Sequence, residues 1–214
     1  MDLKHEIFLI GVGNYTEVVI ELAKDCRFDV KGLYHYDSTR TGESVLGIEI
    51  LGSMEELYNG DISDRNFAVT MGNNRLRNDI ATKLRSLGGK TPNLIHPRAF
   101  VSPSAILGQG CFIHLNSKIS TNCKLGNDCI IDFNSLVAHH ASLDDACYLS
   151  SIAMVGSYCT IGKRVLFGMN ALILPLKLTL GDDCVVGGKA NVTKSFPSNC
   201  LLVGNPAINV KKIS

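Results

Sequence analysis

Apolar residues recur at every sixth position through the middle of this chain of 214 residues. Only 45% of the chain is hydrophobic, yet every position of this column is aliphatic or Phe, so chance does not explain it. A second column, four residues after each member of the first, holds only small residues. The large column consists of Ile95, Val101, Leu107, Ile113, Ile119, Leu125, Ile131, Val137, Leu143, Leu149, Val155, Ile161 and Phe167. The small column consists of Ala99, Ala105, Cys111, Ser117, Cys123, Cys129, Ser135, Ala141, Cys147, Ala153, Cys159, Val165 and Ala171. Such a hexapeptide repeat predicts one short strand and one turn for every six residues.

Three hexads predict a coil of eighteen residues whose three flat faces enclose a narrow interior. Each face has room inside for one large apolar side chain and one small one. Glycine recurs just after the large column, where a tight corner tolerates little side chain. Successive coils would stack at about 4.8 Å, the usual spacing of strands, so the sequence predicts a parallel β-helix. The register breaks by one residue across 174–179 and resumes at Leu180, Val186 and Val192.

The residues before the coil follow a different pattern. We expect strands over 6–10, 30–36 and 67–71, helices over 16–24 and 74–87, and an edge strand over 46–50. Leu76, Ile80 and Leu84 are expected on one face of the second helix. Strand, Gly turn, helix and strand form a βαβ unit, which predicts a small Rossmann-like α/β domain. The domain boundary is expected near Pro92, between residues 1–92 and 93–214.

Composition excludes several classes of partner. The formal net charge of +1 gives no reason to expect binding to nucleic acid or to a membrane surface. The chain shows no signal-peptide pattern and no apolar run that approaches a membrane span, so a cytoplasmic protein is expected. Six of the eight cysteines lie in the small column, counting Cys184 after the register break, and no CxxC pair occurs. We therefore predict buried, structural cysteines rather than disulfides or zinc ligands.

Two loops of the N-terminal domain are candidates for ligand binding. Gly11-x-Gly13 follows the first strand, but Thr16 stands where a dinucleotide fingerprint has its third glycine. This turn either needs a positive φ for structural reasons or brings backbone N–H groups to a phosphate. An NAD site is less expected, because no acidic residue ends the second strand. Asn73, after the third strand, is explained equally well as a helix cap or as a ligand contact.

Among the histidines of the coil, His139 is the candidate general base. The eighteen-residue period stacks His114 on His96 but puts His114 and His139 on different faces, so no metal site is predicted within one subunit. Ser157 falls one coil above His139, beside a turn able to donate a backbone N–H to a developing oxyanion. The alternative is a structural histidine at a turn or a subunit interface. In an extended chain the side chains of His139 and His140 are expected to diverge.

Four motifs occur together along the chain: Gly11-x-Gly13, Gly-Asn-Asn-x-x-Arg at 72–77, Ile-His-Pro-x-Ala at 95–99 and Val-Gly-Asn-Pro-Ala at 203–207. With the hexapeptide repeat, they resemble the sugar O-/N-acyltransferases over residues 6–208. This family includes sialic-acid O-acetyltransferases (the NeuD type) and N-acetyltransferases of nucleotide-linked amino-sugars (the PglD type). The resemblance implies a left-handed β-helix, a homotrimer and acetyl-CoA as cosubstrate.

The resemblance also implies roles for individual residues. His139 is the general base, and the backbone N–H of Ser157 holds the thioester oxygen. The groove for acetyl-CoA is lined by Ser157, Gly168, Gly187 and Lys189. The nucleotide or sugar is held by Gly11, Gly13, Asn14, Gly72, Asn73 and Arg77. The chain departs from the family pattern where His140 replaces the acidic partner of the base, and where Gly-Asn-Tyr at 13–15 replaces Gly-Gly-His.

These features predict an acetyl-CoA-dependent N-acetyltransferase that acts on a nucleotide-linked amino-sugar in surface-glycan biosynthesis. Direct attack is expected, because no Ser or Cys lies beside a His in nucleophile order. A deprotonated amine is a good nucleophile that needs only a modest base, which favours N-acetylation. The alternatives are O-acetylation of sialic acid or a related sugar, and a catalytically inactive trimeric binding protein.

Overall fold

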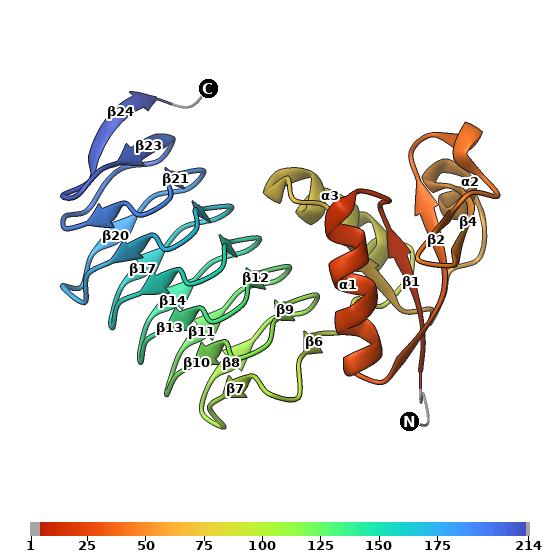
Figure 1. Cartoon of the computed structure of the whole chain (residues 1–214), viewed down its shortest axis with the longest axis horizontal. Helices are drawn as coiled ribbons and strands as arrows, with labels where there is room; N and C mark the ends of the chain where they lie inside the picture. The colour runs from red at the N-terminus through yellow and green to blue at the C-terminus, as the bar shows by residue number, and fades with distance from the viewer. Residues whose placement is uncertain (1–4, 213–214) are drawn as a thin grey trace. The chain divides into compact units, whose positions relative to one another are not determined.

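The computed structural model describes residues 5–212 and divides the chain into two compact units, Met1–Leu94 and Ile95–Ser214. Each unit has a hydrophobic core of its own. The first unit is an α/β domain and the second is a coil of short strands (Figure 1).

The N-terminal unit contains one five-stranded sheet. Its elements are β1 (His5–Ile10), α1 (Asn14–Asp25), β2 (Phe28–His35), the 3-10 helix η1 (Ser38–Arg40), β3 (Ser44–Val45), β4 (Ile48–Ser53), α2 (Met54–Asn59), β5 (Phe67–Val69) and α3 (Asn74–Ser86). The strand order is β3-β4-β2-β1-β5, and every pair except the β3–β4 hairpin is parallel. The predicted Rossmann-like domain is confirmed.

Polar caps start two of the helices. Ser53 and Glu56 form a capping box on α2, in which Ser53 Oγ accepts from the Glu56 N–H at 3.1 Å and the Glu56 carboxylate accepts from the Ser53 N–H at 2.7 Å. Asn73 caps α3, because its Oδ1 accepts from the Leu76 N–H at 2.9 Å. Asn73 therefore has a structural role as a helix cap, whether or not it also contacts a ligand.

The buried face of α3 includes a charged residue. Ile80 and Leu84 are buried, whereas Leu76, which is one turn before Ile80, is 46% exposed. Arg77 is only 1% exposed. Its guanidinium Nη1 donates to the Met71 carbonyl at 3.0 Å, so the buried cation has a hydrogen-bond partner in the loop after β5.

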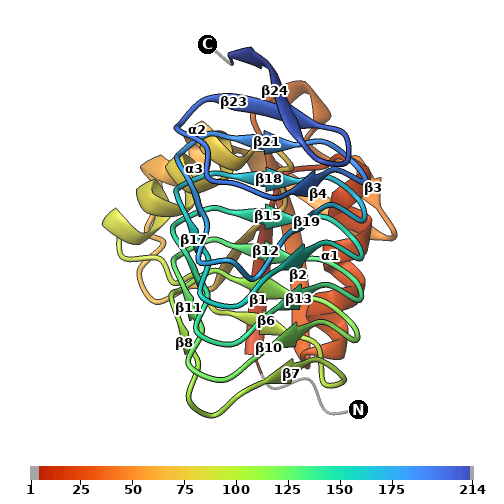
Figure 2. The ribbon, with the colours of Figure 1, turned by 90° about the vertical axis from the view of Figure 1, so that its left-hand side faces the viewer.

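The second unit is a left-handed parallel β-helix made of two-residue strands, which Figure 2 shows stacked above one another. The strands are β6 (Leu94–Ile95), β7 (Phe100–Val101), β8 (Ile106–Leu107), β9 (Phe112–Ile113), β10 (Lys118–Ile119), β11 (Lys124–Leu125), β12 (Ile130–Ile131), β13 (Leu136–Val137), β14 (Ser142–Leu143), β15 (Tyr148–Leu149), β16 (Met154–Val155), β17 (Thr160–Ile161), β18 (Leu166–Phe167), β19 (Leu172–Ile173), β20 (Thr179–Leu180), β21 (Val185–Val186) and β22 (Asn191–Val192). Lys118 pairs with Leu136, eighteen residues on, whereas Thr160 pairs with Thr179 after the one-residue insertion.

Three sheets form the three faces of the coil. One is β7-β10-β13-β16-β19-β22, and another is β8-β11-β14-β17-β20. The third runs from β6 through β9, β12, β15, β18 and β21 to β23 (Cys200–Val203) and β24 (Ile208–Lys212). β24 runs antiparallel to β23 and ends this sheet.

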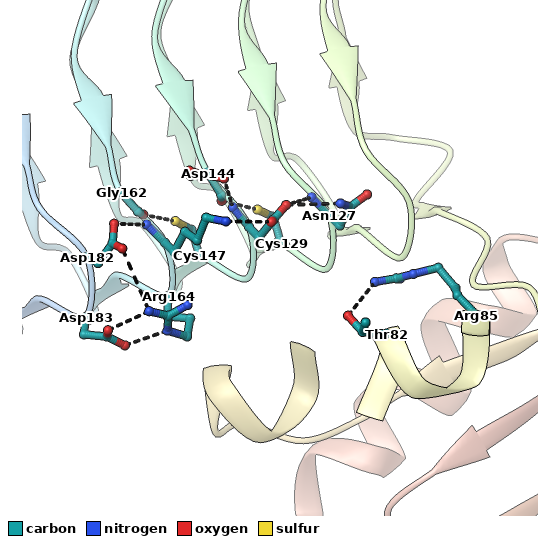
Figure 3. A network of polar contacts seen from close by, with 12 residues as sticks. Thr82, Arg85, Asn127, Cys129, Asp144, Cys147, Gly162, Arg164, Asp182 and Asp183 are labelled. Atoms are coloured by element: carbon teal, nitrogen blue, oxygen red, sulfur yellow. Dashed lines mark hydrogen bonds and ion pairs between the residues drawn. The ribbon is translucent and has the colours of Figure 1, made fainter. Parts of the chain in front are cut away.

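The interior holds the two predicted columns. Val137 and Phe167 of the large column are fully buried, as are Cys129 and Cys147 of the small column. The Cys129 thiol donates to the Asp144 carbonyl at 3.3 Å and the Cys147 thiol to the Gly162 carbonyl at 3.1 Å (Figure 3). All eight cysteines are free, and the six of the small column are buried, as predicted.

The corners explain the recurring glycines. A Cβ on Gly126 would lie 2.6 Å from the Asp145 backbone nitrogen, so close approach of the next coil requires glycine there. Polar side chains also link the coils, because Arg164 makes two 2.7 Å bonds to the Asp183 carboxylate (Figure 3).

Candidate active site

His139 and His140 lie together at one corner of the β-helix, between β13 and β14. We call residues 138–141 the histidine corner. Both side chains are exposed, and their Nδ1 atoms are 3.1 Å apart. The expectation that these side chains diverge was wrong. His140 has a φ of 62°, so the pair occupies a left-handed turn instead of extended chain, and the turn brings the two rings together at 90°.

Residues in the coils below and above extend this contact along the corner. Asn122, one coil below, places its Nδ2 3.2 Å from His140 Nε2. Tyr158, one coil above, stacks on the His140 ring with centroids 4.8 Å apart and meets the His139 ring edge-on at 5.4 Å. Lys177 lies above Tyr158, with Nζ 5.7 Å from the ring centroid. His140 is therefore held on two sides and bonded to His139 on a third.

Ser157 occupies the position one coil above His139, as the period predicts. The Tyr158 N–H donates to the His139 carbonyl at 3.3 Å, which ties the two turns together. Within residues 5–212, no hydrogen bond engages the Ser157 backbone N–H. This donor is therefore available next to the candidate base.

Two grooves flank the histidine corner. The groove on the β13–β16–β19 face has a volume of about 270 Å³, and its lining is almost entirely apolar; Leu136, Met154, Ser157 and Pro175 contribute to it. We call it the apolar groove. The one-residue insertion near Pro175 forms part of its wall, so the break in the repeat shapes the site.

The groove on the β8–β11–β14 face has a volume of about 530 Å³ and is more polar. Its lining includes Ser104, Asn122, Lys124, His140 and Ser142. We call it the polar groove. Because Ala138 lines the apolar groove and His140 lines the polar one, the histidine corner separates the two.

Gly168, Gly187 and Lys189 line neither groove. A Cβ on Gly168 would lie 2.6 Å from the Gly188 nitrogen, and one on Gly187 would lie 3.0 Å from Val203 Cγ1. Coil packing therefore accounts for both glycines without a ligand. Lys189 is an exposed corner residue with a φ of 60°. Their contact with acetyl-CoA stays a prediction.

The two candidate loops of the N-terminal unit lie at the same edge of its sheet, after β1 and β5. Gly11 has a φ of 119°, and a Cβ there would lie 2.6 Å from Thr70 Oγ1. Gly13 has an ordinary φ of −84° and is the N-cap of α1, with open space around it, and exposed Asn14 begins the helix. The positive φ and the close contact with Thr70 thus explain why residue 11 is glycine, whereas Gly13 leaves open space for a ligand at the N-terminus of α1.

The loop after β5 combines open space with a buried cation. Gly72 is exposed, and a Cβ there would meet nothing within 4 Å. Asn73 uses its side chain as the α3 cap, and the Arg77 guanidinium is buried and bonded to the Met71 carbonyl. Arg77 holds the shape of the loop from below, and any substrate contact of these residues stays a prediction.

The other two histidines of the coil, His96 and His114, lie outside the histidine corner. His114 is 1% exposed, packs on Phe133 with ring centroids 4.7 Å apart, and lies within electrostatic range of His96 and Asp132. Burial lowers the pKa of His114 to about 4. The described residues, 5–212, contain no group of three or more His, Cys, Asp and Glu side chains placed to hold a metal ion.

The sequence analysis missed Asn122 and Tyr158, although the signal was present. The same eighteen-residue step that places Ser157 above His139 also places Asn122 below His140 and Tyr158 above it. In the part of the chain that the structure describes, no helix is long and apolar enough to cross a membrane.

Three kinds of comparison bear on this site. The family model of the PglD N-terminal domain matches residues 6–84. An uncharacterised protein of Acanthamoeba polyphaga mimivirus is 26% identical over 111 residues, which are 52% of this chain and 21% of that protein. The aligned part spans only about a fifth to a quarter of the length of the first curated relatives that the chain matches.

Solved structures match along almost the whole chain. A histidine-to-asparagine variant of perosamine N-acetyltransferase from Caulobacter crescentus, in complex with CoA and GDP-perosamine, is 31% identical with a TM-score of 0.89, covering 96% of this chain and 97% of that one. The acetyltransferase domain of PglB from Neisseria gonorrhoeae, in complex with acetyl coenzyme A, is 30% identical with a TM-score of 0.88, covering 97% and 100%.

Proposed function

The chain belongs to the PglD-type family of hexapeptide-repeat sugar acyltransferases, and we propose that it transfers the acetyl group of acetyl-CoA to the amine of a nucleotide-linked amino-sugar. The bound CoA and GDP-perosamine of the perosamine N-acetyltransferase support both substrates. Surface-glycan biosynthesis is the process we propose for the product.

The observation that carries this proposal is the histidine corner. His139 is exposed at the boundary between an apolar and a polar groove, and His140 contacts its Nδ1. A base must be within reach of the proton it removes and must keep its other nitrogen oriented. His139 meets both needs, because Nδ1 faces His140 and Nε2 is left for the acceptor.

Each groove suits one substrate. The apolar groove, which Ser157 lines, fits the pantetheine arm of acetyl-CoA, since few polar partners are needed along an alkyl amide chain. The polar groove offers Ser104, Lys124 and Ser142 to the hydroxyl groups of a sugar. The reacting groups would then meet at His139, where the two grooves adjoin.

The chain's own residues supply acid–base and electrostatic help. His139 Nε2 takes the proton of the acceptor amine as the amine attacks, and the Ser157 N–H donates to the thioester oxygen as it gains charge. Acetyl-CoA supplies an activated acetyl group. The only thiol in the polar groove is Cys123, whose S–H donates to the Ala138 carbonyl at 3.1 Å and whose pKa burial raises. A thiol held in this way supports direct transfer without an acyl-enzyme.

The N-terminal unit would bind the nucleotide. Gly13 and Gly72 leave open space beside the N-termini of α1 and α3, and backbone N–H groups at a helix N-terminus attract phosphate. We further propose, from the family resemblance, that three copies of the chain assemble in the cytoplasm.

Substrate turnover tests the proposal directly. The protein is incubated with acetyl-CoA and a panel of UDP-, dTDP- and GDP-linked amino-sugars, with sialic acid as an O-acetylation substrate, and released CoA thiol is followed. We expect release with at least one nucleotide amino-sugar. Release with sialic acid alone would favour O-acetylation, and no release with any acceptor would favour a binding protein.

Variants at the histidine corner link turnover to the site. His139→Ala should lower kcat by roughly 10² or more, because a positioned base contributes about that factor. His140→Asp restores a carboxylate next to the base and should keep or raise turnover. Unchanged turnover in His139→Ala would make His139 a structural residue.

A further inference from the structure

The contact between His139 and His140 restricts where their protons lie. The two Nδ1 atoms are 3.1 Å apart, so a hydrogen bond forms between neutral rings only if one Nδ1 carries a proton and the other does not. When His140 donates, His139 keeps its proton on Nε2 and has no lone pair there for an acceptor amine. When His139 donates, its Nε2 is free to act as the base.

Asn122 contacts the far nitrogen of His140 and so determines which case holds. With Asn122 Nδ2 donating to His140 Nε2, at 3.2 Å, His140 carries its proton on Nδ1 and donates to His139. A half-turn of the same amide presents Oδ1, which accepts from His140 Nε2–H and leaves His140 Nδ1 to accept from His139. Both rings are exposed, so water exchanges their protons.

We propose that Asn122 and Tyr158 are positioning residues of the transfer reaction, which hold His140 so that it orients His139 where a carboxylate is missing. This inference rests on the proposed function, with His139 as base. Asn122 sets the proton position along a relay made of His139, His140 and Asn122, and Tyr158 fixes the plane of the His140 ring.

The geometry of Tyr158 supports its part. Its ring is nearly parallel to that of His140, at 16° and 4.8 Å, and perpendicular to that of His139. Tyr158 holds a φ of 61°, which is unfavourable for a bulky residue and costs about 1 kcal/mol or more. Stacking on His140 gives a reason for an aromatic ring at this corner, where Asn122 and His140 occupy the same column.

The proton balance of the relay is complete. The amine proton moves to His139 Nε2, and the Nδ1 proton of His139 is shared with or passed to His140 Nδ1. His140 Nε2–H donates to Asn122 Oδ1. As the C–N bond forms and the C–S bond of the thioester breaks, His139 Nε2–H gives the amine proton to the departing CoA thiolate. The other titratable groups around the relay are Tyr158 and Lys177 above it, and Cys123 and Lys124 in the polar groove.

Two variants at Asn122 test the relay. Asn122→Asp always accepts from His140 Nε2–H and locks the base-competent arrangement, so kcat/KM at neutral pH should stay equal or rise, and its acid limb should shift up by about one pH unit. Asn122→Gly keeps the left-handed corner, where φ is 57°, but removes the amide, and kcat/KM should fall about tenfold.

Asn116→Gly is the matched control. Asn116 occupies another corner with a φ of 59° and donates to Asn134, one coil above, at 3.3 Å. It makes the same kind of ladder contact away from the histidines, so its kcat/KM and pH profile should equal those of the wild type. Tyr158→Phe keeps the stacked ring and should preserve kcat/KM, whereas Tyr158→Gly removes the ring and should lower kcat/KM.

Long-range 1H–15N spectra of the two histidines separate this inference from the proposed function. Asn122→Asp should move His139 toward the tautomer protonated on Nδ1, and Asn122→Gly should lose that bias. Identical His139 tautomers in all three proteins would overturn the relay, whatever the activity. If the tautomers shift but no acceptor is acetylated, the relay stands and the proposed function fails.

Discussion

His114 is a buried histidine that lies outside the histidine corner. It is 1% exposed, and burial outweighs the opposing effect of Asp132, so its pKa falls from 6.5 to about 4. In the unfolded chain the imidazole takes up a proton near pH 6.5, whereas in the folded chain it stays neutral until about pH 4. The unfolded state therefore binds more protons between these values.

The free energy of unfolding should consequently fall as the pH is lowered from 6.5 to 4. This loss begins as the pH falls through 6.5 and amounts to about 2–3 kcal/mol by the time the folded pKa of about 4 is reached. Urea unfolding at half-unit pH steps measures the slope. His114→Gln cannot titrate and should flatten that slope, whatever its absolute stability. An unchanged slope in His114→Gln would contradict the assignment.

At the scale of single elements, the distance between coils fixes where glycine is required. A Cβ on Gly168 would lie 2.6 Å from the Gly188 nitrogen, which no side-chain adjustment relieves. A Cβ on Gly188 would approach Met169 O at 3.4 Å, an ordinary contact. Gly168 and Gly188 therefore serve as test and control positions for an added Cβ.

Gly168→Ala should lower the free energy of unfolding by about 1–3 kcal/mol, because the coils must separate locally. Gly188→Ala should change it little. Thermal melts without CoA measure both, and a fall in Tm of about 5 °C is expected for Gly168→Ala. An unchanged Tm combined with weaker CoA binding would instead assign Gly168 to the cosubstrate, as the resemblance implies.

The hexad period predicted the strands of the coil and their register, because those depend on side-chain volume at fixed spacing. It also placed Ser157 above His139. It did not predict the direction of side chains at the corners, since that follows from backbone φ, and His140 at 62° turns toward His139. In the N-terminal unit, apolar periodicity likewise could not show that Arg77 is buried, because arginine is a charged residue and its partner, the Met71 carbonyl, lies in a loop outside the helix.

At the scale of the whole molecule, each of the two units has a core cluster of its own. One cluster lies in the coil and includes six cysteines of its small column, while another, around Phe67 and Leu84, lies in the N-terminal unit. The coil's thiols donate to backbone carbonyls of the next coil, as Cys123 does to Ala138 and Cys159 to Leu174, at 3.1 and 3.2 Å. Cross-linking therefore plays no part in stabilising the β-helix.

Thiol reactivity tests this arrangement for the entire chain. Seven of the eight cysteines are buried and Cys26 is partly exposed, and burial raises the pKa of the Cys123, Cys159 and Cys184 thiols. Ellman's reagent should label at most Cys26 rapidly in the native protein and all eight thiols after denaturation, and a reductant should leave Tm unchanged. A denatured count below eight, or a Tm that falls with reductant, would reveal a disulfide. A native count near eight would show that the coil opens, and the CoA-release assay would then need a thiol-free readout.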